Sequence, residues 1–114
     1  MQVSRRGEFY VVSRITGPTH NFLGLRFGGV GDCILSQKWV QSNFQQCVEP
    51  ELVRREVLAA VAEANAKWST NYTVAEVEFV GDDTPIYRAY RMLANLLIER
   101  MHSDLLSSEP TSDK

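Results

Sequence analysis

The chain has 114 residues and a formal net charge of −2, from 12 lysines and arginines against 14 aspartates and glutamates. This length suits one domain, since single domains usually have roughly 100–150 residues. Hydrophobic residues make up 44% of the chain and charged residues 23%, which is ordinary for a globular protein and excludes a collagen-like, coiled-coil or wholly disordered chain. A pI near 5.6 argues against a dedicated duplex-DNA binder, which is normally basic.

The sequence has no apolar run approaching the about 20 residues that a membrane-spanning helix needs. Arg5 and Arg6 near the start are not followed by the apolar stretch of roughly 7–15 residues that a signal peptide contains. We therefore predict a cytoplasmic protein that does not contact a membrane. Cys33 and Cys47 lie 14 positions apart and match no CxxC pattern, so we expect two reduced thiols.

Residues 8–16 and 20–27 are rich in β-branched and aromatic types and predict two strands, joined by a three-residue Gly-Pro-Thr turn. Such a loop predicts an antiparallel hairpin in which Thr16 lies opposite His20. Because successive side chains alternate between faces, the face expected to meet the core carries Phe9, Val11, Ile15, Leu23, Leu25 and Phe27. The outer face then carries Tyr10, Val12, Arg14, Phe22, Gly24 and Arg26.

Residues 33–48 fit two interpretations. The pairs Ile34-Leu35 and Trp39-Val40 indicate a short third strand around residues 33–41. A four-residue spacing of apolar side chains is equally typical of a helix, through Val40, Phe44 and Val48. We favour the strand.

A helix is predicted from Pro50 onward, because proline suits the first helical turn and an apolar stripe follows. The stripe consists of Val53, Val57, Ala60, Val61, Ala64 and Trp68. Residues 72–80 then alternate between apolar and polar types and predict a strand. We expect Ala75, Val77 and Phe79 to point toward the core. Glu76 and Glu78 should point outward.

Thr84 and Pro85 predict the start of a second helix, with the threonine as N-cap and the proline in the first helical position. The inward stripe of this helix is Ile86, Tyr90, Leu93, Leu97 and Met101. We expect it to end near Leu106, with residues 1–106 as a single domain and residues 107–114 as a disordered polar tail. The predicted fold is an α+β two-layer sandwich: a mainly antiparallel sheet of three to four strands with two helices packed on one face.

The motifs indicate no catalytic or metal site, so we predict a protein without enzymatic activity, cofactor or metal. The glycine-rich residues 28–31 lack the last glycine of GxGxxG and precede no Gly-Lys-Ser/Thr. His20 and His102 pair with no nucleophile at a known spacing, and we expect surface or helix-capping roles. A small enzyme that gathers His20, Cys33 or Asp82 in space is the alternative left open.

The predicted outer face of the hairpin is the main candidate binding surface, through Tyr10, Arg14, Phe22 and Arg26. Aromatic side chains beside arginine are enriched at protein–protein hot spots. The same composition forms sheet surfaces that stack single-stranded bases. We favour a protein partner over nucleic acid. The alternatives are a small RNA-binding sheet module, a homodimer, a subunit of a larger assembly, or side chains simply covered by the rest of the chain.

Charge is distributed unevenly along the sequence. The first 31 residues carry four arginines and one glutamate, whereas residues 32–102 carry seven basic and ten acidic residues. The acidic part is a natural surface for a basic, nuclease-like partner. Asp82 and Asp83 are therefore candidate partner contacts, although the same pair also suits a turn before the positive end of a helix.

Two segments are similar to a known class of proteins. They are residues 77–85 (VEFVGDDTP), followed by Tyr90 and Leu93-Ala94, and residues 20–27 (HNFLGLRF). They resemble the strand–helix ending and an early strand of small bacterial immunity-type proteins, the cytoplasmic antidotes of polymorphic toxin systems. The resemblance implies a non-enzymatic inhibitor that binds one toxin domain tightly. It assigns no binding residues, because such proteins use different surfaces for different toxins.

Overall fold

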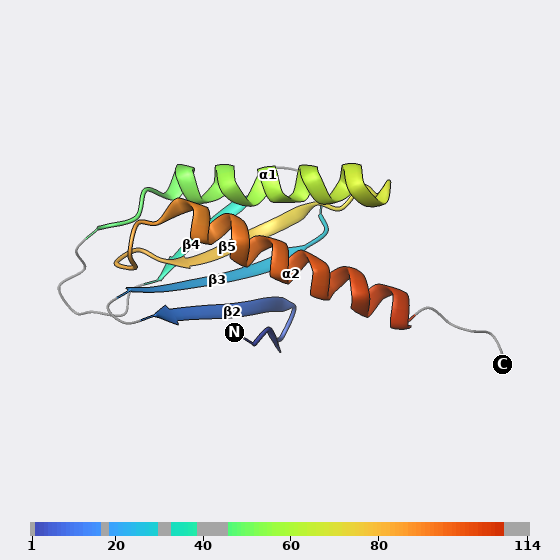
Figure 1. Cartoon of the computed structure of the whole chain (residues 1–114), viewed down its shortest axis with the longest axis horizontal. Helices are drawn as coiled ribbons and strands as arrows, with labels where there is room; N and C mark the ends of the chain where they lie inside the picture. The colour runs from blue at the N-terminus through green and yellow to red at the C-terminus, as the bar shows by residue number, and fades with distance from the viewer. Residues whose placement is uncertain (1, 17–18, 30–32, 39–45, 109–114) are drawn as a thin grey trace, which may run out of the picture.

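The structure, a computed structural model, describes residues 2–16, 19–29, 33–38 and 46–108. These residues form five strands and two helices, and Figure 1 shows how the labelled elements are arranged. In chain order the elements are β1 (Ser4–Arg6), β2 (Phe9–Thr16), β3 (Thr19–Phe27), β4 (Ile34–Lys38), α1 (Pro50–Trp68), β5 (Val74–Val80) and α2 (Tyr87–Ser108).

The strands form one mixed sheet in the order β1-β2-β3-β5-β4. The pairs β1–β2, β2–β3 and β3–β5 are antiparallel, and β4 runs parallel to β5, which follows it in the chain after α1. Both helices pack against the same face of the sheet (Figure 1). The predicted α+β sandwich is confirmed, with five strands rather than three to four, because the short edge strand β1 adds to the predicted set.

The β2–β3 hairpin has a different register from the predicted one. Thr16 pairs with Thr19 rather than with His20, which shortens the loop to two residues and shifts every pair by one position. A one-residue shift turns the side chains of one strand to the opposite face. The prediction that Phe9, Val11 and Ile15 of β2 face the core is therefore wrong. These three side chains face away from the helices.

Strand β2 is apolar on both faces, so alternation alone does not decide which side is buried. In the structure Tyr10 and Val12 meet the core, with 6% and 2% of their surface exposed. Tyr10 can be buried because its hydroxyl donates to Asp104 Oδ2 (3.0 Å) and accepts a hydrogen bond from Arg5 Nη1 (3.0 Å). The inward side chains predicted for β3 do pack on the core: Leu23, Leu25 and Phe27.

Helix α1 and the strands on either side of it follow the predicted pattern. The predicted apolar stripe of α1 is buried except for Trp68, which is partly buried. The helix ends at Ser69 in the left-handed conformation, where the Ser69 N–H binds the Asn65 carbonyl. The predicted strand around residues 33–41 is present as β4, whereas Trp39, Val40 and Phe44 lie outside the described residues. In β5 the two larger predicted inward side chains are fully buried: Val77 and Phe79.

Helix α2 begins at Tyr87, three residues after the predicted N-cap Thr84. Thr84 instead joins its loop to β3: its hydroxyl accepts a hydrogen bond from the His20 N–H (3.3 Å), and its carbonyl accepts one from Asn21 Nδ2 (2.7 Å). The predicted cap is wrong because these contacts with β3 take the place of capping. The rest of the predicted stripe is buried on α2, through Tyr90, Leu93, Leu97 and Met101.

The two helices contact each other through Arg91 of α2, which pairs with Glu56 (2.9 Å) and Glu63 (3.0 Å) of α1. Helix α2 runs to Ser108, two residues beyond its predicted end, and residues 109–114 of the predicted tail lie outside the described residues. In the described ranges, neither helix combines the length and the apolar character needed to cross a membrane.

Candidate functional site

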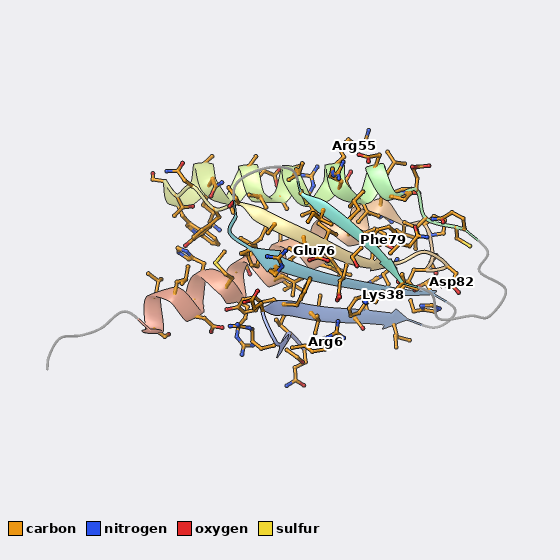
Figure 2. The ribbon with its side chains drawn as sticks, turned by 180° about the vertical axis from the view of Figure 1, so that it is seen from behind. Arg6, Lys38, Arg55, Glu76, Phe79 and Asp82 are labelled. Carbon is orange, nitrogen blue, oxygen red and sulfur yellow. The ribbon has the colours of Figure 1, made fainter. Side chains whose placement is uncertain are left out.

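The sheet has one face without helices, which we call the open face, and Figure 2 views the molecule from this side. The labelled Arg6, Lys38 and Glu76 belong to three different strands of this face, whereas Arg55 lies on α1 (Figure 2). By strand register the open face carries Ser4, Arg6, Phe9, Val11, Ser13, Ile15, His20, Phe22, Gly24, Arg26, Ile34, Ser36, Lys38, Glu76, Glu78 and Val80.

Glu78 is the central charged group of the open face. Arg6 Nη2 of β1 lies 2.5 Å from Glu78 Oε1, and Lys38 Nζ of β4 lies 3.3 Å from Glu78 Oε2. The two cations therefore reach the middle of the sheet from its opposite edges. The Glu78 side chain is only 10% exposed, whereas those of Arg6 and Lys38 are 58% and 47% exposed.

Gly24 provides the space in which the Glu78 carboxylate lies. It pairs with Glu78 across β3 and β5. A Cβ atom at position 24 would lie 3.1 Å from Glu78 Oε1 and 3.1 Å from Val11 Cγ1, both closer than ordinary van der Waals contact. The missing side chain thus lets the glutamate lie across the strand and reach Arg6 on the far side of β2.

A second ion pair lies further along the same face. Arg26 Nη2 is 3.1 Å from Glu76 Oε1, and these side chains are 30% and 22% exposed. The Arg6 guanidinium also lies 5.8 Å from the centre of the Phe22 ring, within cation–π range. In each ion pair the cation is more exposed than its carboxylate, so the solvent-facing charge of the open face is mainly positive.

One end of the open face is fixed by a His–Asp pair. His20 Nδ1 lies 2.7 Å from Asp83 Oδ1, and the Phe22 N–H donates to Asp83 Oδ2 (2.8 Å). Burial raises the pKa of the Asp83 carboxyl, and the hydrogen bonds from Phe22 and His20 act in the opposite direction. Beside the pair is a hollow of about 390 Å³, which Ser13 and Ile15 also line. The contacts of Asp83 hold β3 to the loop before α2.

The structure separates the predicted binding residues. Phe22 and Arg26 lie on the open face, but Tyr10 and Arg14 lie on the helix side, so the predicted four-residue patch is not one surface. The reason is the hairpin register, which turns β2 over relative to β3.

The predicted acidic contacts are also largely enclosed. Asp82 is 8% exposed and Asp83 1% exposed, and Asp83 is occupied by His20 and by the backbone of β3. Asp82 and Asp83 therefore do not provide the exposed acidic surface that the charge distribution predicted.

Sequence reasoning missed Arg6 and Lys38 as parts of the open face, and it placed Gly24 on this face without recognising its role beside Glu78. A glycine inside a predicted strand is a signal for close approach, and Gly24 carries that signal. Arg6 and Lys38 offer no such signal, because only the strand order brings the two sheet edges to the same glutamate.

The remaining reactive side chains have structural contacts. His102 stacks on Trp68 with ring centres 3.8 Å apart, and its Nδ1 lies 2.5 Å from the Tyr72 hydroxyl, so it packs between elements instead of capping α2. Burial raises the pKa of the Cys33 thiol, which disfavours the reactive thiolate. No cluster of three or more potential metal ligands occurs within residues 2–16, 19–29, 33–38 and 46–108.

Comparisons with known proteins indicate neither a family nor a function for this chain. The sequence matches no family model and no curated protein, and the structure matches no solved structure.

Proposed function

We propose that this chain is a non-enzymatic protein-binding domain whose open face contacts a protein partner. More specifically, we propose a cytoplasmic immunity protein that binds and neutralises a cognate bacterial toxin domain. The resemblance of residues 20–27 and 77–85 to immunity-type proteins supports the specific form, and the open face supports the general one.

The observation that carries the proposal is the composition of the open face. Apolar side chains share the open face with the Glu78 ion pairs, and two of them, Ile15 and Ile34, are 74% and 55% exposed. Phe22 lies partly exposed between the ion pairs and the His20–Asp83 end. Apolar and aromatic anchors beside arginine are the composition of protein interfaces, where burial of the anchors supplies most of the affinity.

The charges of this face indicate the chemistry of the partner. Because Arg6 and Lys38 are exposed while Glu78 is buried beneath them, a partner meets cations first. A partner surface that mixes carboxylates with apolar side chains would complement this arrangement. This differs from the basic partner surface that the sequence predicted for Asp82 and Asp83.

RNA is the less favoured partner, although Phe9 and Phe22 both lie on the open face. Arg6, Lys38 and Arg26 are already paired with Glu78 and Glu76, so contact with phosphates would leave these carboxylates without their cations. Phosphate contacts supply much of the affinity of proteins for nucleic acids.

Sequencing the neighbouring genes and co-expressing this chain with a toxin-like domain encoded there tests the proposal, which predicts that such a domain exists. We expect the two proteins to purify together and the cells to be protected. Ile34→Glu should raise the Kd more than about tenfold by placing a charge at an apolar anchor. Leu106→Glu is the matched control, because Leu106 is 62% exposed on α2, away from the open face, and should keep wild-type affinity.

Two results would contradict the proposal. One is a wild-type protein that neither binds the toxin-like domain nor protects cells. The other is tight, salt-dependent binding of oligouridylate that Ile34→Glu weakens, which would identify the open face as an RNA surface instead.

A further inference from the structure

Most cationic side chains in the described part of the chain have a partner. Arg5 binds the Tyr10 hydroxyl, and Lys67 lies 5.7 Å from the centre of the Trp68 ring. Six more form ion pairs with carboxylates: Arg6, Arg26, Lys38, Arg54, Arg91 and Arg100. Among the described residues, three arginines form no ion pair, hydrogen bond or ring contact: Arg14, Arg55 and Arg88.

Two of these three arginines line the same hollow. Arg14 of β2 and Arg88 of α2 border a cavity of about 460 Å³ on the helix side of the sheet, where the end of the hairpin meets the start of α2. Cavities of roughly 300–1,000 Å³ are typical of small-molecule sites. The third arginine, Arg55, lies on α1 (Figure 2). It is not among the residues that line this cavity. The cavity is separate from the open face, because Arg14 projects from the opposite side of β2.

The lining of the cavity combines positive charge with apolar surface. Besides the two arginines and Thr19, the described lining consists of Ile86, Ala89 and Met92, and none of these described residues is a carboxylate. The first turn of α2, which borders the cavity, also contains no acidic residue. Two like charges that face one hollow without a counter-charge repel each other, and a bound anion would relieve this repulsion.

We propose that this cavity binds a small amphiphile, a carboxylate or phosphate group carried on a compact apolar body. Arg14 and Arg88 bind the anion, since guanidinium groups match the oxygens of both head groups in paired hydrogen bonds. Ile86 and Met92 contact the apolar body. Met92 is 36% exposed, so part of the cavity wall gains burial only when a ligand is present. This site is independent of the protein-binding function proposed for the open face.

Calorimetric titration of the full chain with octanoate, octyl phosphate and octan-1-ol tests the proposal. We expect at least one octyl anion to bind and octan-1-ol to bind more weakly, because only the anions supply the counter-charge. The tighter of the two anions identifies the preferred head group. Arg14→Gln and Arg88→Gln should each raise the Kd of that anion about tenfold or more.

Arg55→Gln is the matched control, since it removes an equally unpartnered arginine outside the cavity and should leave the Kd unchanged. Met92→Gln should weaken both octyl anions, because it replaces apolar wall with an amide. Circular dichroism of each variant verifies the fold. The proposal is overturned if neither octyl anion binds the wild-type protein, or if the Arg14 and Arg88 variants bind as tightly as the Arg55 variant.

Discussion

Two buried carboxylates, Asp83 and Glu78, are held in different ways. Asp83 is fixed by a backbone N–H of β3 and by the His20 ring, and only 1% of its surface is exposed. Glu78 is held by two long side chains, Arg6 and Lys38, that are about half exposed. Backbone donors have a fixed geometry, whereas exposed arginine and lysine side chains can reorient at little cost.

This difference separates a region that stabilises the fold from one that can adapt to a partner. The contacts of Asp83 and Thr84 tie β3 to the start of α2, so they set the relative position of the sheet and the second helix. The Glu78 contacts join the two edges of the sheet at its surface. We therefore expect the free energy of unfolding to respond strongly to changes at Asp83 and weakly to changes at Arg6 or Lys38.

The largest effect is expected from Asp83→Ala. The substitution leaves the part-buried Phe22 N–H and the His20 ring without their acceptor, which should lower the free energy of unfolding by about 2–3 kcal/mol. Urea denaturation followed by circular dichroism measures this change. Glu99→Ala, an exposed carboxylate on α2, is the control and should change stability by less than about 0.5 kcal/mol. Equal effects of the two variants would contradict a stabilising role of Asp83.

Gly24→Ala should have a smaller effect, a loss of about 1 kcal/mol, because the new methyl group crowds the Glu78 carboxylate and Val11. Urea denaturation of Gly24→Ala, Glu78→Ala and the double variant forms a cycle. The cost of the alanine at position 24 should shrink when Glu78 is absent. An unchanged cost would show that the glycine does not serve the position of the glutamate.

A modest pH-dependent effect is expected from Asp83→Asn, which keeps an acceptor for Phe22. Burial raises the Asp83 pKa above its ordinary value of 3.8, so the folded chain retains a proton that the unfolded chain has lost. Retaining this proton stabilises the folded state. The stabilisation is fully present below pH 3.8 and is lost as the pH rises through the raised pKa of Asp83.

The asparagine variant lacks that decline. Its free energy of unfolding should therefore rise relative to that of the wild type between about pH 3 and pH 6, while other carboxylates cancel in the comparison. Urea denaturation across this range measures the difference. A difference that stays constant with pH would contradict the raised pKa.

The smallest effect on stability is expected from Lys38→Met. An ion pair whose cation is 47% exposed contributes little, so the free energy of unfolding should change by less than about 0.5 kcal/mol. The same variant should weaken binding of a protein partner at the open face, as measured by calorimetry. A large loss of stability would show that the ion pairs of Glu78 stabilise the fold, as the contacts of Asp83 do.

The order of the elements could be predicted because the sequence carries strong local patterns. The stripe from Val53 to Ala64 and the one from Tyr90 to Met101 each define a helix, and both are buried. The alternation around Val77 and Phe79 likewise defined β5.

The hairpin register could not be predicted from such patterns. Residues Phe9 to Val12 are apolar throughout, so either face of β2 could meet the core, and the assumed loop was one residue too long. That single error placed Tyr10 and Arg14 on the wrong surface. Phe22 and Arg26 were placed correctly on the face away from the helices, because β3 alternates clearly.

The interior position of β5, between β3 and β4, has a consequence for the synthesis of the protein on the ribosome. Strands β3 and β4 both pair with β5, which is the last strand in the chain. Until residues 74–80 have emerged, the hairpin is a small ribbon of marginal stability and β4 is an unpaired strand. Long-range pairing of this kind slows folding and leaves strand edges open to other chains. The complete sheet can therefore form only after β5, which ends at Val80, has left the ribosome, and until then the unpaired strand edges of the nascent chain are prone to aggregation.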